Sequence, residues 1–356
     1  MTKQQTMLEH LFSYYHYRPI IQHYQLIPYK IKLNNPLNTA SSCLKVRQGF
    51  LIKLTCSYGF SAIGECAPMK EIGTENLHQA KQCLEQYLAL LLGKKVSTQT
   101  LPDPNIYPAS CFALEYALLS LLAQKKNSSI TNLLKIFWPQ NNDSQIKVNA
   151  LLGSLDEHSI SYARELELRG FRCLKIKLGV SPIEKEIQQI KSLFEQLLPS
   201  TKLRFDINKH WSIEQSEWFL ATLKDYDSQI DSIEEPLSVC RYHDYSQLQQ
   251  KTTISLALDE SFNHTKGFAN FPVKRLIVKP MAQGGLLASL AHIKTAQQYG
   301  IEIIITSSFE TAYGLWAITQ LCALLDNKHY HGLATADWLS DPLIAPPEIH
   351  HGIIDL

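Results

Sequence analysis

The sequence has almost no net charge and no long hydrophobic run. Its 34 Lys and Arg residues are balanced by 33 Asp and Glu residues, which leaves a formal net charge of +1 over 356 residues. This balance gives no electrostatic reason to expect binding to nucleic acid or to an anionic membrane surface. A membrane-spanning helix needs about eighteen or more consecutive apolar residues, and no such stretch is present. We therefore expect neither a nucleic-acid partner nor a membrane location.

Cysteine pairs and a targeting segment are also lacking. The eight cysteines are scattered without a CxxC pair, and the first residues show no basic segment followed by a long apolar run. A secretory signal would carry both features, so none is predicted. In a large chain without such a signal, reduced and buried thiols are expected in place of disulfides. The sequence thus predicts a cytoplasmic protein, and it holds no motif from which an oligomeric state could be predicted.

Residues 1–140 combine strand and helix patterns. Apolar, partly alternating runs at 26–33 and 49–55 predict strands. Apolar residues at helical spacing predict helices at 74–92 and 108–123. Strands followed by helices are typical of an α+β module.

After about residue 142, short apolar runs alternate with amphipathic stretches at intervals of about 25 to 30 residues, the length of a βα unit. Such repeats predict either a parallel barrel or an open doubly wound sheet. No glycine-rich dinucleotide fingerprint follows the first strand, which weakens the second option. The strand candidates are 147–152, 173–178, 202–206, 232–234, 255–259, 275–279 and 302–306, with a weaker one at 331–334.

Ionisable and polar residues stand at the ends of these strand candidates, where barrel enzymes place their chemistry. Because residues two apart share one face of a strand, Lys175 and Lys177 point the same way. Carboxylates on consecutive strands can converge, and hard oxygen ligands with no His or Cys beside them suit Mg²⁺ better than zinc. The groups are Lys175, Lys177, Asp206, Glu234, Asp259, Lys279 and Thr306-Ser307-Ser308.

The lysines make chemical sense beside a metal. A lysine near another cation and a metal has a lowered pKa and can act as a base. When a carboxylate of the substrate is bound to the metal, it can take a second negative charge as the adjacent carbon of the substrate loses its proton. Each residue alone could be a helix cap, an edge-strand charge or a turn. Their order along successive strands favours a proton-abstraction site.

At these residues the sequence resembles the enolase superfamily, in its muconate-lactonising subgroup. Ile207 and Lys209-His210 depart from the Asp-Ala-Asn-X-X-Trp that relatives often carry, but they flank Asp206 without replacing it. The matching pieces are 175–177, 206–208, 233–236, 259–261 and 279–280 with 284–286.

The resemblance implies an α/β fold, a (β/α)7-8 TIM-like barrel with an α+β capping domain formed by the N-terminal module and the C-terminal tail. We expect the capping domain at 1–140 and the barrel with the active site at 141–328. Residues 329–356 would hold the last strand region and the tail that returns to the capping domain.

The resemblance also implies roles for individual residues. Asp206, Glu234 and Asp259 correspond to the Mg²⁺ ligands, with Glu235 as second choice to Glu234. Lys177 corresponds to the base on one face of the substrate and Lys279 to the lysine on the other. Lys175 would tune Lys177 and help to hold the substrate carboxylate.

Five further residues are predicted substrate contacts: Thr39, Arg204, Asn208, Ser307 and Ser308. The hydroxyl groups could equally be ordinary loop and turn hydroxyls. Arg204 could instead form an ion pair with an acid of the barrel.

The implied reaction is Mg²⁺-dependent removal of the proton next to the carboxylate of a small-molecule substrate. Segments outside the shared site, including 64–68 and 306–311, resemble those of a dehydratase of this subgroup, so the resemblance implies a lyase. The nearest alternative is an N-acylamino acid racemase or dipeptide epimerase that uses the same two lysines. A dipeptide epimerase would be expected to carry Asp-X-Asp near the last strand, which Asp337 and the residues after it do not match. A glycoside hydrolase barrel and a non-catalytic scaffold are the alternatives of other classes.

Overall fold

The computed structural model describes residues 2–38, 43–97, 100–139, 145–262, 267–326 and 328–356. Thr39, one of the predicted substrate contacts, lies outside the described residues. No helix in these ranges is long and apolar enough to cross a membrane. The cysteines whose side chains are described are all free thiols, and all but Cys240 are buried.

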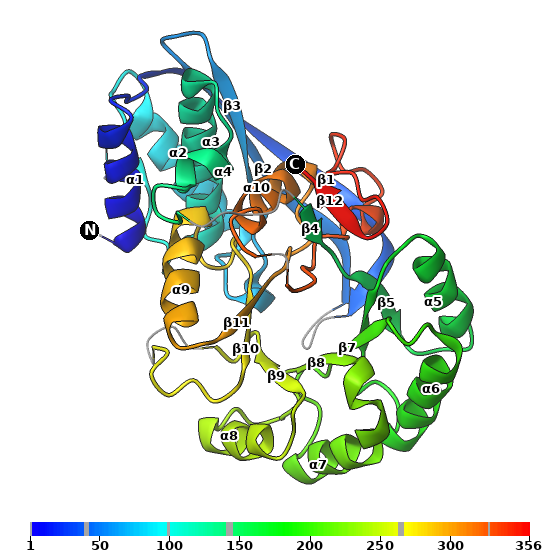
Figure 1. The fold of residues 1–356 in the computed structure, drawn as a ribbon. Coiled ribbons are helices and arrows are strands. Elements are labelled where there is room, and N and C mark those ends of the chain that lie inside the picture. Colours follow the sequence, from blue (N-terminus) through cyan, green and yellow to red (C-terminus); the bar gives the residue numbers. More distant parts are fainter. Residues whose placement is uncertain (1, 39–42, 98–99, 140–144, 263–266, 327) are drawn as a thin grey trace.

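The N-terminal part is a three-stranded antiparallel sheet packed against helices (Figure 1). Helix α3 begins with Pro108, a residue suited to a first helical turn, and it is buried on almost every side. It lies directly on β3, since a Cβ atom added to Gly64 would come within 2.0 Å of the Ala113 carbonyl oxygen. The elements are α1 (Lys3–Tyr14), β1 (Ile21–Asn38), β2 (Cys43–Cys56), β3 (Ser61–Cys66), η1 (Lys70–Ile72), α2 (Leu77–Leu91), α3 (Pro108–Lys126) and α4 (Ile130–Leu134).

Helix α1 was not predicted from the sequence pattern. It has a capping box in which Thr2 and Gln5 exchange hydrogen bonds. Its apolar side, which includes Leu8, Leu11 and Phe12, is buried in the core. Figure 1 shows α1 beside α9, a helix of the second half of the chain. The helix is therefore stabilised by tertiary packing.

The second half of the chain forms a curled parallel sheet of seven strands, in the order β11-β10-β9-β8-β7-β6-β5 (Figure 1). Strand order follows chain order without the reversal that a doubly wound sheet requires, so that alternative was wrong. The elements are β5 (Ala150–Ser154), α5 (Ser159–Leu168), β6 (Cys173–Lys177), α6 (Ile183–Gln196), β7 (Lys202–Asp206), α7 (Ile213–Thr222), η3 (Lys224–Gln229), β8 (Ile230–Glu234), α8 (Tyr242–Gln250), β9 (Ser255–Leu258), β10 (Arg275–Val278), α9 (Leu286–Gln298), β11 (Glu302–Ile305) and α10 (Ala312–Cys322).

An irregular segment closes the space between the two outer strands of this sheet. His331 forms a single parallel bridge with Val148, and Gly332 forms one with Thr306. The imidazole Nδ1 of His331 accepts a hydrogen bond from the Ile305 amide (3.0 Å), and burial lowers the pKa of His331 to about 3. The weak strand predicted at 331–334 is therefore two single bridges held by a neutral histidine.

The chain before and after the barrel forms a small sheet of its own. The predicted strand at 147–152 is divided, because β4 (Gln145–Lys147) pairs antiparallel with β12 (Ile353–Asp355) and only β5 joins the barrel. The tail also contacts the N-terminal sheet, since the Ser340 amide donates to the Lys32 carbonyl (2.9 Å). A short helix, η5 (Ala336–Trp338), precedes that contact. The predicted domain boundaries at 140 and 328 stay predictions.

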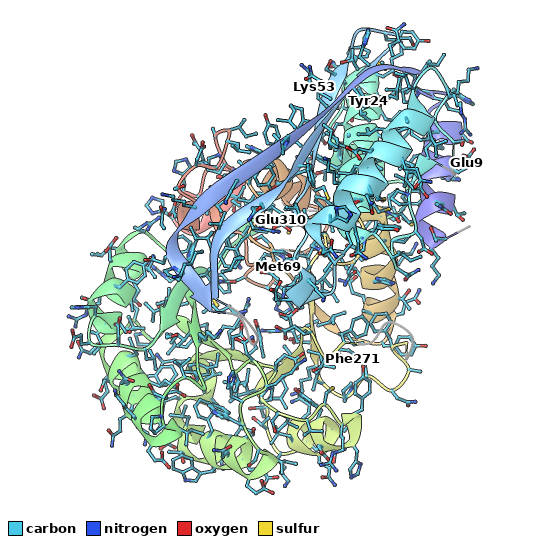
Figure 2. All side chains as sticks on the ribbon, turned by 180° about the vertical axis from the view of Figure 1, so that it is seen from behind. Glu9, Tyr24, Lys53, Met69, Phe271 and Glu310 are labelled. Atoms are coloured by element: carbon cyan, nitrogen blue, oxygen red, sulfur yellow. The ribbon has the colours of Figure 1, made fainter. Side chains whose placement is uncertain are left out.

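Two buried glutamates of the N-terminal part accept hydrogen bonds at the starts of barrel helices. Glu115 of α3 accepts from the amides of Leu286 (2.5 Å) and Leu287 (3.1 Å) at the start of α9. Glu65 of β3 accepts from the amides of Thr311 (2.9 Å) and Gly314 (2.8 Å) at the start of α10. An acid at a helix N-terminus satisfies amides that have no partner within the helix. Figure 2 shows Met69 and Glu310 at this junction between the two parts.

We expect Gly285→Ala to destabilise the fold by about 2 to 4 kcal/mol in urea unfolding. Gly285 has φ +149°, and an added Cβ would lie 2.6 Å from both Glu115 Oε1 and Gln4 Nε2. Gly300 is the matched control, because it also has positive φ (+71°) but nothing within 4 Å of an added Cβ. Gly300→Ala should cost only the backbone strain, about 1 kcal/mol. Equal losses in both variants would contradict the close packing at Gly285.

Candidate active site

A cavity of about 350 Å³ opens at the C-terminal ends of the barrel strands. Residues of the N-terminal part, among them Pro36, Met69 and Ile72, line it from one side, and Trp338 of the C-terminal segment lines it from another. Phe309 also lines it and packs edge-on against Trp338, with ring centroids 5.8 Å apart. Charged side chains of the barrel therefore line one part of the cavity, and side chains that are partly apolar line the rest.

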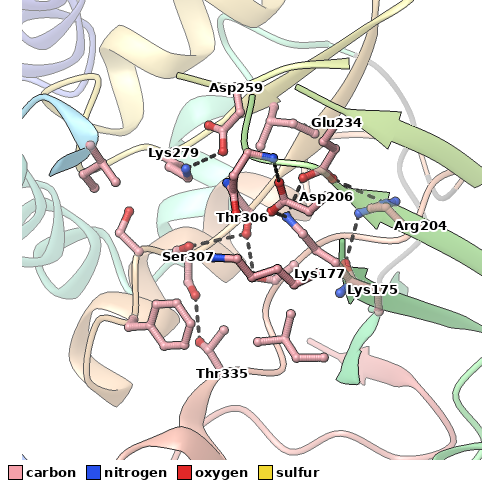
Figure 3. Close-up of a pocket in the computed structure, with 18 of the residues that line it drawn as sticks. Lys175, Lys177, Arg204, Asp206, Glu234, Asp259, Lys279, Thr306, Ser307 and Thr335 are labelled. Atoms are coloured by element: carbon pink, nitrogen blue, oxygen red, sulfur yellow. Dashed lines mark hydrogen bonds and ion pairs between the residues drawn. The ribbon is translucent and has the colours of Figure 1, made fainter. Parts of the chain in front are cut away.

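Ten of the predicted site residues line this one cavity (Figure 3). Strand register explains much of the clustering, since Lys177 pairs with Asp206 and Asp206 pairs with Glu234 on adjacent strands. Groups at the same level of neighbouring parallel strands must lie near one another. The ten are Lys175, Lys177, Arg204, Asp206, Asn208, Glu234, Asp259, Lys279, Ser307 and Ser308.

Two lysines form ion pairs with the three carboxylates (Figure 3). Lys175 Nζ lies 2.9 Å from Asp206 Oδ2 and also contacts Glu234, while Lys279 contacts Asp259. Burial by itself lowers the pKa of Lys175, but the charges of the surrounding acids outweigh it and raise that pKa. The pKa of Lys279 is raised for the same reason, mainly by Asp259. Both ammonium groups therefore serve as counter-charges for the acids.

The pKa values of two of the acids shift in opposite directions, although burial by itself raises both. Burial favours the neutral form of Asp206, but the charge and hydrogen bond of Lys175 outweigh it and lower the pKa. At Glu234, which is almost completely buried, desolvation dominates and the pKa is raised. Because a buried carboxylate is costly unless its charge is balanced, these acids favour binding of a cation.

Lys177 differs from the other two lysines in the direction of its pKa shift. Burial lowers the pKa of Lys177, and the charges of Asp206 and Glu260 oppose this only in part. The positive charge of Lys175 contributes in the same direction as burial but is the smaller cause. The sequence predicted a lowered pKa from a neighbouring cation, whereas the structure assigns most of the effect to burial.

Arg204 belongs to a buried ionic network. Its side chain is 1% exposed, and its Nε lies 2.8 Å from Asp231 Oδ2. Its other nitrogens donate to Asn149 Oδ1 (3.0 Å) and to the Tyr330 carbonyl (2.9 Å). Of the two roles open for Arg204, the structure shows the ion pair with a barrel acid. Arg204 also lines the cavity, so its role as a substrate contact stays a prediction.

The predicted hydroxyl contacts are not equivalent. Ser307 Oγ forms a hydrogen bond with Thr335 Oγ1 (2.7 Å), which is the ordinary loop role. Ser308 Oγ is buried and has no hydrogen-bond partner among the described residues. The backbone N–H of Asn208 donates to Asp206 Oδ1 (3.3 Å). Asn208 has φ +47°, which turns the chain after β7. Ser308 thus has hydrogen-bonding capacity left for a ligand.

The adjacent glutamates of β8 and its exit point to different places. Glu234 lines the cavity, whereas the Glu235 carboxylate accepts hydrogen bonds from the Asp259 and Ser261 amides. The geometry therefore favours Glu234 over Glu235 as a metal ligand.

Several lining residues were missed by sequence reasoning. Glu260 faces the cavity, and burial together with the Asp259 charge raises its pKa to about 7. It lies inside the Asp-Glu-Ser segment that was singled out, so its position could have signalled it. Phe309 likewise lies in the segment 306–311 that was singled out, whereas Glu71 and Trp338 come to the barrel mouth from outside the barrel strands.

The donor set fits a hard divalent cation. Within the described residues no three His, Cys, Asp or Glu side chains are gathered tightly enough to form a ready metal site. Lys175 and Lys279 lie among the three acids instead and supply positive charge there. Each carboxylate has more lone pairs than one ammonium contact uses, and oxygen-only donors suit Mg²⁺. The chemistry of these residues fits Mg²⁺ once the ammonium groups move aside.

Comparisons with known proteins define the class. Residues 159–356 match the family model described as enolase C-terminal domain-like, and residues 21–121 match the one described as MenC, N-terminal domain. The chain belongs to the enolase superfamily. This membership agrees with the (β/α) barrel and its N-terminal sheet cap, and it gives no support to a glycoside hydrolase.

Individual relatives are similar over most of the chain. An o-succinylbenzoate synthase of Pasteurella multocida is 26% identical over 95% of this chain and 96% of the relative. Another, from Photorhabdus laumondii, is 29% identical over 85% of this chain and 86% of the relative. A dipeptide epimerase from Enterococcus faecalis, solved with Mg and a dipeptide, superposes with a TM-score of 0.79. It is 22% identical and covers 94% of this chain and 97% of its own. At that identity the likeness concerns the fold alone.

Proposed function

We propose that this chain is an o-succinylbenzoate synthase, a hydro-lyase of menaquinone biosynthesis. Its substrate would be 2-succinyl-6-hydroxy-2,4-cyclohexadiene-1-carboxylate, which loses water in a syn elimination. The observation that carries the proposal is one cavity into which Lys177 and Lys279 project from separate strands, with three carboxylates on the strands between them. Similarity to synthases along nearly the whole chain supports this reaction over others of the superfamily.

Lys177 would remove the proton next to the ring carboxylate. The same lysine, once protonated, would assist departure of the hydroxyl group as water on the same face, and an aromatic ring would result. Lys175, held between Asp206 and Glu234, would help to hold the substrate carboxylate as a cation. Lys279 would face the developing ring as a cation, an interaction of the cation–π kind.

Asp206, Glu234 and Asp259 would hold Mg²⁺. When bound, the ion would stabilise the second negative charge that develops on the substrate carboxylate. The cap residues above the cavity, among them Met69 and Trp338, would exclude water and position the substrate. Aromatisation supplies driving force, so positioning and charge stabilisation are the main demands on the protein.

The second candidate is an N-acylamino acid racemase or dipeptide epimerase, in which the two lysines would exchange a proton across the substrate. The likeness to a dipeptide epimerase fold favours considering it. A dipeptide substrate carries an ammonium group, which calls for an acid near the last strand. Asp337 is exposed and pairs with Arg169 (3.3 Å), while its neighbour Trp338 lines the cavity. This segment therefore offers an aromatic wall where a dipeptide would need a carboxylate.

The test supplies the cyclohexadiene substrate with Mg²⁺ and follows the ultraviolet absorbance of the aromatic product. An N-succinyl amino acid is run in parallel and followed by optical rotation. We expect dehydration that stops when the metal is removed with EDTA and resumes when Mg²⁺ is restored. Racemisation without dehydration would favour the second candidate. Dehydration that persists without metal would contradict the assigned role of the three acids.

A further inference from the structure

Glu235 has no role in the proposed chemistry, yet its carboxylate is completely buried and fully used. It accepts hydrogen bonds from the amides of Asp259 (2.7 Å) and Ser261 (2.8 Å). Its second oxygen accepts from Ser261 Oγ (2.6 Å) and from the hydroxyl of Tyr245 in α8 (3.1 Å). The backbone of Glu235 has φ +45°, which turns its side chain away from the side that Glu234 takes. Such a conformation is uncommon for a non-glycine residue.

These contacts lie where the sheet stops holding the next strand. The register between β8 and β9 ends at the pair of Glu234 and Ala257, and the Glu235 amide adds one bond to the Ala257 carbonyl (3.0 Å). Strand β9 ends at Leu258, so Asp259 is the first residue beyond it. Beyond that point, hydrogen bonds to the Glu235 carboxylate replace the backbone pairing between the strands, and they hold the backbone amides on both sides of Glu260.

We propose that Glu235 is a positioning residue that holds Asp259 at the metal site. It acts on the backbone of Asp259 and does not touch the metal itself. The proposal rests on the proposed function only in taking Asp259 as an Mg²⁺ ligand. This role also explains why the segments Glu234-Glu235 and Asp259-Glu260-Ser261 are joined by hydrogen bonds. The first residue of each segment faces the cavity, and Glu235 and Ser261 bind the two segments together.

The experiment measures Mg²⁺ binding to the full-length protein by isothermal titration calorimetry, without substrate. Glu235→Ala removes every acceptor and should weaken Mg²⁺ binding about 10- to 100-fold, the usual effect of losing a residue that supports a metal ligand. Glu235→Gln should bind within about threefold of wild type. Its amide oxygen can accept the two backbone N–H groups, and its NH₂ group can donate to the two hydroxyls. Recovery by this variant ties the effect to the hydrogen bonds.

Glu75 provides a matched control. It is a buried glutamate that also accepts two backbone amides and a serine hydroxyl, from Ala109 (3.0 Å) and from Ser110 (2.8 and 2.6 Å). It lies in the N-terminal part and contacts none of the three acids. Glu75→Ala should lower stability to a comparable extent and leave Mg²⁺ affinity unchanged.

Three outcomes would count against the proposal. Unchanged Mg²⁺ affinity in Glu235→Ala, or an equal loss in Glu75→Ala, would overturn it while leaving the proposed function intact. Absence of Mg²⁺ binding by the wild type would instead overturn the metal role on which both depend. If Glu235→Ala does not fold, Glu235→Asp decides, because its carboxylate is one methylene too short to reach the Asp259 amide. It should bind Mg²⁺ at least tenfold more weakly.

Discussion

Replacing Lys177 by alanine is expected to lower dehydration of the cyclohexadiene substrate by about 10³-fold or more. Lys177 stands at the C-terminal end of β6 and lines the same cavity as the three acids and Lys279. In the proposed reaction it both removes the proton and returns one to the leaving hydroxyl, so its loss affects both steps. The measurement is the rate of aromatic product formation at saturating Mg²⁺.

Two controls separate this effect from damage to the fold. Lys177→Arg keeps the positive charge and similar length but cannot act as a base, since a guanidinium stays protonated. It should therefore be as inactive as the alanine variant. Mg²⁺ affinity and the urea midpoint of both variants should stay close to those of the wild type. A Lys177→Ala variant with turnover within tenfold of the wild type would refute the assignment of this lysine as the base.

Asp231→Asn is expected to lower the free energy of unfolding by about 3 to 5 kcal/mol, the usual cost of breaking a buried ion pair from one side. Asp231 Oδ2 lies 2.8 Å from Arg204 Nε and 2.7 Å from Arg275 Nη1. Those two arginine side chains are 1% and 5% exposed, so neither can turn to solvent. The substitution removes the negative charge between two buried guanidinium groups. Urea unfolding at pH 7 provides the measurement.

The contacts of Asp231 with the two arginines also predict that the stability of the fold depends on pH. Burial by itself raises the pKa of Asp231, but the charges of Arg204 and Arg275 outweigh it and hold that pKa well below the ordinary value of 3.8. An acid with a depressed pKa stabilises the fold above its unfolded pKa and loses that contribution as the pH falls. The stability difference between wild type and Asp231→Asn should therefore be full at pH 7 and shrink below about pH 4.

An exposed ion pair serves as the control for this prediction. Arg169 and Asp337 are 3.3 Å apart, with side chains that are 47% and 81% exposed. Asp337→Asn should change stability little, because exposed pairs are screened by water and salt. If Asp231→Asn were no more destabilising than Asp337→Asn, the buried network would not be needed for folding.

Much of the barrel could be predicted from the sequence because its information is local. The strands predicted at 173–178, 202–206 and 302–306 correspond to β6, β7 and β11 within one residue at each end. A buried parallel strand is a short apolar run, and the amphipathic helix after it has its own period, so both are visible in a few neighbouring residues. The polar residue that ends each run is visible in the same way. The sequence therefore predicted that the acids and lysines lie together at the C-terminal ends of the barrel strands.

The tertiary structure decided which polar groups meet, because those pairs are far apart in the chain. Arg204 reaches Asp231 and the Tyr330 carbonyl, and Glu115 reaches the start of α9, although nothing near these residues in sequence marks the partner. Glu234 is the last residue of β8, whereas the positive φ of Glu235 (+45°) turns the chain directly after it, so the two side chains have different uses. The residue types and their order along the strands were set by the sequence alone. Burial and long-range packing then determined which of those charges pair with one another and which face the cavity.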